Sequence, residues 1–312
     1  IIIYYDISIK YLYGGYMIDQ RIETFLCVCE YMNYTKASQA LHITQPAVSQ
    51  HIRFLEERYN TKLFAYQDRK LSLTKAGKVL LETMTVIRND EEMMIKLMHD
   101  QPSTFHLTFG VTLTVGEYAL AKPLSLFLKN HPEINMHILY GNAKQILEKL
   151  EKGEIHFALI EGYYPSKKYE QLHYYTDNFV CVCAKNHKFA HKVSRIEDLL
   201  DERIFLREKG AGTRDLLDSY LKTYNLTYSD FKNYVEVESI SSIISLLKND
   251  CGIAFIYRLA ASEELASGAL KEVNIQNLPL HHDTSFIWNK NSIFSKRYRT
   301  ICEELMSYEP MK

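Results

Sequence analysis

The sequence predicts an α/β protein in two parts, a small helical unit joined by a long helix to a larger domain of alternating strands and helices. Apolar residues recur at helical spacing in three short stretches between residues 18 and 59. A longer helical stretch follows, from residue 74 to about residue 99. From residue 105 onward, short apolar runs alternate with helical stretches, which is typical of a parallel sheet with helices on both faces. The length of 312 residues fits about two domains.

The charge of the chain is balanced overall but not locally. Lys and Arg number 37 and Asp and Glu 38, so the net charge alone does not point to nucleic acid. Between residues 35 and 78, however, there are eight basic residues and three acidic ones. This local excess fits a surface for nucleic acid, and it also fits an ordinary solvated helical surface. No apolar run reaches the ~18 residues that a membrane span needs, so we expect no membrane partner.

Three short helices are expected before residue 60. The first spans residues 18–32 and the second residues 36–41. Residues 42–43 form a tight turn, and the third helix spans residue 44 to about residue 59. Two short helices joined by a tight turn, the second with a polar outer face, make a helix-turn-helix.

The third helix has the features of a helix that lies in a DNA groove. Thr44 is an N-cap residue, whose hydroxyl can accept a hydrogen bond from a free amide of the first turn. Pro46 sits in that turn, where its missing N–H costs nothing. The apolar face consists of Val48, Ile52 and Leu55. The opposite face carries side chains that can contact base edges and phosphates, namely Gln45, Ser49, Gln50 and Arg53.

A small β-hairpin and a long helix follow. Strands at residues 63–65 and 71–73 flank a tip that carries Arg69 and Lys70, which can reach a phosphate or the minor groove. The long helix has apolar residues near heptad spacing, which favours packing against a second subunit. Residues 101–103 break the helix and mark the domain boundary. The apolar stripe consists of Leu80, Leu81, Met84, Ile87, Met94, Ile95 and Met98.

The larger domain is expected to contain strands that alternate with helices. The expected strands span residues 106–111, 136–140, 157–160, 179–184, 204–206, 234–237, 252–256, 270–275 and 284–288. The expected helices span residues 118–130, 143–152, 195–200, 215–224, 241–249 and 295–306.

The N-terminal residues and the cysteines need separate interpretations. Residues 1–16 are apolar and aromatic but lack a basic start and a cleavage site, so a secretory signal is not expected. We interpret them as a non-native upstream extension, with Met17 as the natural start.

The six cysteines lie in apolar runs without C-x-x-C spacing, which is typical of small buried side chains. We therefore expect no metal site and no cofactor.

The residues of the helix-turn-helix resemble those of the LysR-type transcriptional regulators, and the likeness extends over nearly all of residues 17–308. Within the family, residues 159–162 and 207–214 look most like the subgroup of cysteine-biosynthesis regulators. The residues that carry the likeness, all at the family's spacing, are Phe25, Ala37, Ser38, Ala40, Leu41, residues 44–49, Ile52, Leu55, Glu56, Leu63, Phe64, Arg69, Leu73, Thr74, Ala76 and Gly77.

The resemblance implies a sequence-specific DNA-binding regulator, not an enzyme, that a small-molecule effector switches. The implied domains are the extension at residues 1–16, a winged helix-turn-helix at 17–76, a dimerising linker helix at 77–102 and an effector domain at 103–312. The effector domain is expected to be periplasmic-binding-protein-like, with lobe I at about 103–177 and 259–308 and lobe II at about 178–258. The implied partners are double-stranded DNA, the effector, further copies of the chain in a homodimer or homotetramer, and RNA polymerase, all in the cytoplasm.

The resemblance also implies which residues contact DNA. The position of Gln50 is often Arg in relatives, which affects the base preference. Arg53 and Arg69 match phosphate or minor-groove contacts, and the alternative for Arg53 is a salt bridge with Glu56 or Glu57 on the helix surface. The expected DNA-binding residues are Thr35, Ser38, Thr44, Gln45, Pro46, Ser49, Gln50, Arg53, Arg69 and Lys70.

A ligand site is expected beyond the carboxyl ends of the strands, where ligands of open α/β sheets bind and where helix N-termini favour anions. Each candidate segment alone fits plain helix capping, whereas together, and with the resemblance, they predict an effector pocket between the lobes. Two facing helix N-termini would suit a small anion or carboxylate, whereas Glu161 could repel an anion or bind an ammonium, so the expected effector is anionic or amino-acid-like. The expected site consists of Thr112, Thr114, Asn142, Glu161, Gly162, Gly210, Ala211 and Thr213.

Two other functions fit parts of the chain. A solute-binding protein of a transporter would explain the larger domain but not the helix-turn-helix, and it needs an export signal. An enzyme on the α/β scaffold is the remaining alternative. The histidines available to it show no catalytic order, phosphate loop or metal spacing. These histidines are His173, His187, His191, His281 and His282.

Overall fold

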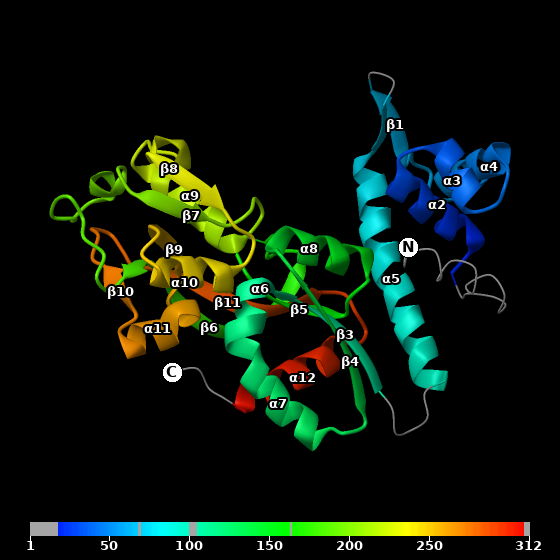
Figure 1. Cartoon of the computed structure of the whole chain (residues 1–312). Helices are drawn as coiled ribbons and strands as arrows, with labels where there is room; N and C mark the ends of the chain where they lie inside the picture. The colour runs from blue at the N-terminus through cyan, green and yellow to red at the C-terminus, as the bar shows by residue number, and fades with distance from the viewer. Residues whose placement is uncertain (1–17, 68–69, 100–104, 163, 309–312) are drawn as a thin grey trace. The chain divides into compact units, whose positions relative to one another are not determined.

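The chain forms two compact units, which are described separately (Figure 1). The first contains residues 1–100 and 291–293, and the second contains residues 101–290 and 294–312. The computed structural model describes residues 18–67, 70–99, 105–162 and 164–308. The interpretation of residues 1–16 and the predicted role of Arg69 therefore lie outside the described residues.

The first unit contains the predicted helix-turn-helix. Each of its three helices begins after a side chain that accepts a hydrogen bond from a backbone N–H of the first turn: Asp19, Asn33 and Thr44. The helices are α2 (Gln20–Tyr31), α3 (Tyr34–Ala40) and α4 (Gln45–Arg58). Phe25 and Val48 are fully buried in the core that these helices share. Because this core holds the apolar face of α4, the opposite face is left at the surface.

The predicted wing and long helix follow as β1 (Phe64–Gln67), β2 (Lys70–Leu73) and α5 (Lys75–His99). Thr74 joins the hairpin to α5, because its hydroxyl donates to the carbonyl of Lys62 at 2.6 Å and accepts from the N–H of Gly77 at 3.0 Å. Gly77 lies so close to the hairpin that a Cβ there would be 2.1 Å from the carbonyl oxygen of Leu63. A side chain at this position would separate α5 from the wing.

The apolar stripe of α5 divides into two groups. Leu80, Leu81 and Met84 pack against the core of the helix-turn-helix within the same chain. Val79 and Ile87, in contrast, are 59% and 42% exposed. The exposed apolar residues are therefore better placed than the start of the predicted stripe to contact a second subunit.

The second unit is built on one sheet, in the order β4-β3-β5-β11-β6-β9-β7-β8, with β10 beside β6. Its strands are β3 (Phe105–Thr112), β4 (Ile134–Gly141), β5 (Phe157–Glu161), β6 (Tyr169–Ala184), β7 (Arg203–Leu206), β8 (Asn233–Glu236), β9 (Ile253–Tyr257), β10 (Leu270–Val273) and β11 (Leu280–Asn289). The pairs of β3 with β4 and β5, and of β7 with β8 and β9, are parallel, as expected.

The expectation of a parallel sheet is wrong for the central strands. β11 runs antiparallel to β5 and β6, and β6 runs antiparallel to β9 and β10. The reason is the connection of the two lobes. The first half of β6 pairs with β11 in lobe I and its second half with β9 and β10 in lobe II, so the chain leaves one lobe and returns to it in the opposite direction.

Helices cover the sheet in both lobes (Figure 1). Those of lobe I are α6 (Leu113–Val115), η1 (Gly116–Leu120), α7 (Ala121–Asn130), α8 (Ala143–Lys152) and α12 (Ser295–Ser307). Those of lobe II are η2 (Ile196–Leu199), α9 (Gly212–Thr223), η3 (Tyr228–Asp230), α10 (Ile240–Lys248), η4 (Arg258–Ala261) and α11 (Ser262–Ser267).

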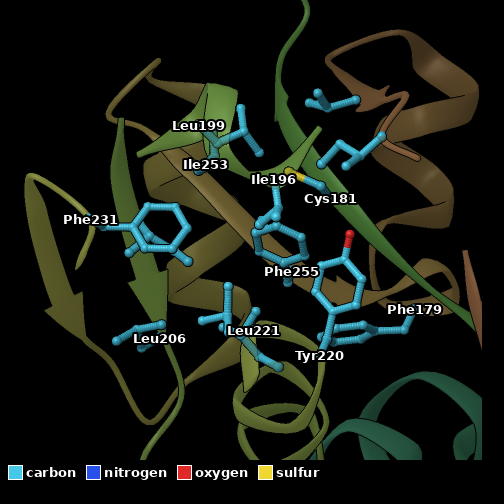
Figure 2. Packing of buried hydrophobic residues seen from close by; sticks show 14 of the residues in the cluster. Phe179, Cys181, Ile196, Leu199, Leu206, Tyr220, Leu221, Phe231, Ile253 and Phe255 are labelled. Atoms are coloured by element: carbon cyan, nitrogen blue, oxygen red, sulfur yellow. The ribbon is translucent and has the colours of Figure 1, made fainter. Parts of the chain in front are cut away.

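The expected return to lobe I at residue 259 needs correction. β10 pairs with the lobe II half of β6, and Val273 is buried in the lobe II core with Phe179 and Phe255. Figure 2 shows this core, in which the ring of Phe255 lies 6.1 Å from that of Phe179 and 6.3 Å from that of Tyr220. The chain therefore re-enters lobe I only with β11, because the apolar residues before it complete the core of lobe II.

Candidate functional site

The N-terminal end of α4 presents hydrogen-bonding side chains at the surface. The hydroxyl of Thr44 accepts a hydrogen bond from the N–H of Ala47 at 3.3 Å, which holds the first turn. The side-chain amide of Gln45 donates to the hydroxyl of Ser49 at 3.1 Å. This bond uses one of the two amide hydrogens and leaves the other, with the amide oxygen, for a base edge.

A groove of about 530 Å³ runs beside these residues and connects α4 with the wing. Glu56 holds the two together, because its carboxylate pairs with Lys62 at 2.6 Å and accepts from the N–H of Leu63 at 3.0 Å. Among the described residues no ion pair of Arg53 is found, so the alternative of a salt bridge with Glu56 or Glu57 is not realised there. The groove is lined by Met32, Asn33, Tyr34, Thr35, Gln45, Ser49, Ile52, Arg53, Glu56, Lys62, Tyr66 and Leu71.

The expected DNA-binding residues differ in how far they are exposed to solvent. Ser38 does not fit the expectation, because it is only 5% exposed and its hydroxyl donates to the carbonyl of Thr35 at 2.8 Å. Sequence reasoning missed Tyr66, which is 71% exposed on the wing beside the groove. Residues of the expected set that lie exposed are Thr35, Thr44, Gln45, Pro46, Gln50, Arg53 and Lys70.

A second polar site lies where the two lobes meet. Thr112 ends β3 and Glu161 ends the neighbouring parallel strand β5, so both side chains emerge at one edge of the sheet. The hydroxyl of Thr112 donates to Oε2 of Glu161 at 2.6 Å. Thr112 and Glu161 are 1% and 4% exposed, so this bond is shielded from water.

Lobe II contacts the same site through the start of α9. A Cβ on Gly212 would lie 3.1 Å from Cγ of Glu161, and one on Gly162 would lie 3.7 Å from Cα of Gly212. Gly210 also lies close to a residue of lobe I, namely Asn142. Its φ of +91° is in the left-handed region. The structure therefore brings together the four segments that supply the expected effector-binding residues. We refer to Thr112, Thr114, Glu161, Gly212 and Thr213 as the lobe junction.

The electrostatics of the lobe junction are dominated by the burial of Glu161. Burial raises the pKa of this carboxyl to about 7, whereas the hydrogen bond from Thr112 and the charge of Arg207 lower it. Asp177 raises it further. Arg207 is itself buried and its guanidinium donates twice to Glu208, at 2.9 Å and 3.1 Å. The cation that acts on Glu161 is therefore also paired with Glu208.

Several hydroxyls at or near the junction have no hydrogen-bond partner. Among the described residues, the side-chain oxygens of Thr114, Thr213 and Tyr257 are buried and unpartnered. Sequence reasoning did not assign Tyr257 or Arg207 to the site. Tyr257 is the last residue of β9 and Arg207 follows β7, so the strand-end rule applied to lobe II would have found both. In the described chain no three His, Cys, Asp or Glu residues are placed to hold a metal ion.

Comparison with known protein families shows which family contains both the helix-turn-helix and the domain with the lobe junction. The family model for the bacterial regulatory helix-turn-helix protein, lysR family, matches residues 20–78, and the model for the LysR substrate binding domain matches residues 100–308. The chain belongs to the LysR family. It is therefore a DNA-binding transcriptional regulator with an effector-binding domain, in a family of regulators rather than enzymes. The helix-turn-helix match excludes a plain solute-binding protein.

Curated relatives span most of this LysR regulator. It is 28% identical to the HTH-type transcriptional regulator CysL of Bacillus subtilis (strain 168), over 85% of this chain and 89% of the relative. It is also 28% identical to the probable RuBisCO transcriptional regulator of Cyanidium caldarium, over 88% of each chain.

Solved structures share the fold at low identity. Full-length LysG of Corynebacterium glutamicum with bound effector Arg has a TM-score of 0.63 at 15% identity, covering 94% of this chain and 98% of that one. A full-length OxyR variant of Pseudomonas aeruginosa has a TM-score of 0.58 at 15% identity, covering 94% of this chain and 95% of that one. Within the described residues, no helix has both the length and the apolar character for a membrane span.

Proposed function

We propose that this LysR regulator reads its operator with the exposed face of α4, as a homodimer or homotetramer, and that a small molecule at the lobe junction switches it. The observation that carries the proposal is the lobe junction itself, where a buried carboxyl and unpartnered hydroxyls meet between two lobes. A buried polar group without a partner costs about 1–3 kcal/mol, and a ligand can remove that cost. The site of action is the cytoplasm, with RNA polymerase as a further partner on DNA.

Base reading by α4 is supported by Gln45 and Ser49, whose mutual hydrogen bond orients the amide at the surface. Arg53 is exposed and lines the groove, Lys70 is exposed on β2, and both supply positive charge for phosphates. Ser38 is left out of this proposal because it is buried. Lys62 and Tyr66 are added because they line the groove from the wing side.

Self-association is supported by an apolar groove along α5 and by exposed aromatic side chains at the sheet edges. Val79, Leu80 and Met84 line an apolar groove of about 730 Å³ along α5, next to Tyr59. At the two edges of the sheet, β4 and β8 expose Tyr140 and Tyr234 by 48% and 51%. An edge strand with exposed aromatic side chains favours pairing with another chain. The α5 groove accounts for a dimer, and the sheet edges provide the additional contacts that a tetramer needs.

Control by the effector follows from the position of the lobe junction, where lobe I and lobe II are in contact. A ligand shifts an equilibrium only if it binds one arrangement better than the other. A ligand at the junction would replace the contact of Gly212 with Glu161 by contacts of its own, so it would favour a different arrangement of the lobes.

Replacing Thr112 with valine is expected to weaken effector binding by roughly 10- to 100-fold, since a hydrogen bond to a charged group contributes about 1.5–3 kcal/mol. Isothermal titration calorimetry with small carboxylic and amino acids measures it. The control is Thr108→Val, the same change on the same strand but away from the junction. A ligand that binds the Thr112→Val protein as tightly as the wild type would exclude this site.

A further inference from the structure

We propose that the effector of this regulator binds through a primary ammonium group, which pairs with the carboxylate of Glu161. The proposal rests on the proposed effector site at the lobe junction and names the chemical group that the site recognises. It is carried by the charges around Glu161 and by the hydrogen-bonding capacity of the neighbouring side chains.

The charges around Glu161 leave its carboxylate with one cation, which another carboxylate shares. The charged groups that act on it are Asp177 of β6, which is negative, and Arg207 after β7, which is positive. Because Nε and Nη2 of Arg207 donate to Glu208, this one cation is divided between two carboxylates. An anionic ligand would place a further negative charge in this site, whereas a cation would supply the missing positive one.

The hydrogen-bonding groups of the junction also match an ammonium. An ammonium has three N–H donors and no acceptor. Glu161 accepts from the Thr112 hydroxyl and from the backbone N–H of Val115, and its carboxylate has capacity for further donors. The buried hydroxyls of Thr114, Thr213 and Tyr257, unpartnered among the described residues, are additional acceptors, and each lies within lobe segments that meet at Glu161.

The phenols near Glu161 add no charge to this balance. Burial raises the pKa of Tyr175 and of Tyr257 far above the ordinary value, so both stay neutral at physiological pH. Asp177 faces the same region, and burial raises its pKa as well, although backbone N–H groups of Leu259 and Asn178 donate to it. Glu161 is thus the group in this site whose protonation changes near neutral pH.

Proton release follows from this arrangement. The pKa of Glu161 is raised to about 7, so without ligand a fraction of the carboxyl groups is protonated at pH 7. An ammonium binds the carboxylate form, and binding therefore releases protons at pH 7. Below pH 7 the affinity should fall, approaching roughly a tenfold loss for each pH unit. Above pH 8 it should be constant until the ammonium itself titrates.

The test uses methylammonium chloride as the probe and the full chain as the protein. Melting temperatures are measured at pH 8 and pH 5.5, against sodium chloride at equal ionic strength and against tetramethylammonium, which has no N–H donor. We expect methylammonium to raise the melting temperature of the wild type at pH 8, with most of the shift lost at pH 5.5. Glu161→Gln should show no shift at either pH. Calorimetry at pH 7 in phosphate and in HEPES, which carries no primary amine, should report proton release on binding.

A second variant tests the charge argument while Glu161 stays in place. Glu208→Gln frees the Arg207 guanidinium to compensate Glu161, so it should weaken methylammonium binding at least tenfold. No shift for the wild type at pH 8, or equal shifts for wild type and Glu161→Gln, would overturn the proposal. Gel shifts with the same preparations distinguish a failure of the ammonium assignment from a failure of the proposed function. If operator binding and the effect of Thr112→Val persist without methylammonium binding, the ammonium assignment fails and the proposed function stands.

Discussion

Replacing Gln45 with alanine is expected to weaken binding of the full chain to its operator by roughly 30- to 10⁴-fold. A side-chain amide that contacts an adenine contributes about 1–3 kcal/mol, and a symmetric dimer loses the contact in both half-sites. The hydrogen bond from Gln45 to Ser49 holds the amide in place before DNA arrives, so little ordering cost offsets this contribution. The measurement is a gel-shift titration on the protein's own upstream region at fixed salt.

Two further variants distinguish base reading from general attraction to DNA. Arg53→Ala removes an exposed charge, and it should weaken specific and non-specific DNA binding alike and reduce the salt dependence. Gln20→Ala, the same substitution at an exposed position of α2, should change neither the affinity for DNA nor its salt dependence. If Gln45→Ala bound the operator with unchanged affinity and unchanged base preference, α4 would not be the reading helix in the way that we propose.

Replacing Val79 with glutamate is expected to lower the apparent operator affinity by roughly 10²- to 10⁴-fold, because two linked half-site contacts become independent. Val79 is 59% exposed and lines the apolar groove of α5, so a charge there opposes the packing of a second copy. Glutamate favours a helix more than valine does, so weakening of α5 cannot account for the loss. Analytical ultracentrifugation should show smaller particles for this variant than for the wild type.

The matched control is Glu82→Gln, an exposed position on the same helix that does not line the groove. It should keep both the oligomeric state and the operator affinity. A Val79→Glu protein that sediments like the wild type would show that the copies associate through another surface, and the exposed edge strands β4 and β8 would then be tested through Tyr140 and Tyr234.

Local patterns predicted the first unit well because its helices carry their own boundary signals. Thr44 caps α4 within one residue of its expected start, Asn33 caps α3 two residues before its expected start, and Gly77 sits where α5 meets the wing. Ser38 shows the limit of this reasoning. Its position in the motif suggested a DNA contact, but its place on the helix turns it inward, where its hydroxyl bonds to the carbonyl of Thr35.

Long-range pairing in the second unit could not be predicted in the same way. The first half of β6, residues 169–178, was not expected as a strand because its polar and aromatic residues alternate without a continuous apolar run. β10 was expected as a strand, but its membership of lobe II depends on pairing with residues about 90 positions earlier. Strand direction likewise follows from how the chain crosses between lobes, which local composition does not encode.

The segments of the lobe junction could be expected where a strand end or a helix start carries a hydroxyl residue, as at Thr112 and Thr213. Arg207 and Tyr257 were not assigned to it because their types are common at surfaces and in cores. Their roles depend on burial and on the pairing of Arg207 with Glu208, which only the folded chain reveals.

The central claim is that the lobe junction controls what α4 does on DNA. A footprint of Gly212→Leu on the upstream region tests it most directly, without knowledge of the effector. A Cβ added at Gly212 would lie 3.1 Å from Cγ of Glu161, so we expect the larger side chain of a leucine there to separate the lobes. Ser219→Leu, at an exposed position of the same helix, is the control. We predict a footprint of changed length or spacing for Gly212→Leu alone; a footprint identical to the wild type, from a folded protein, would contradict the claim.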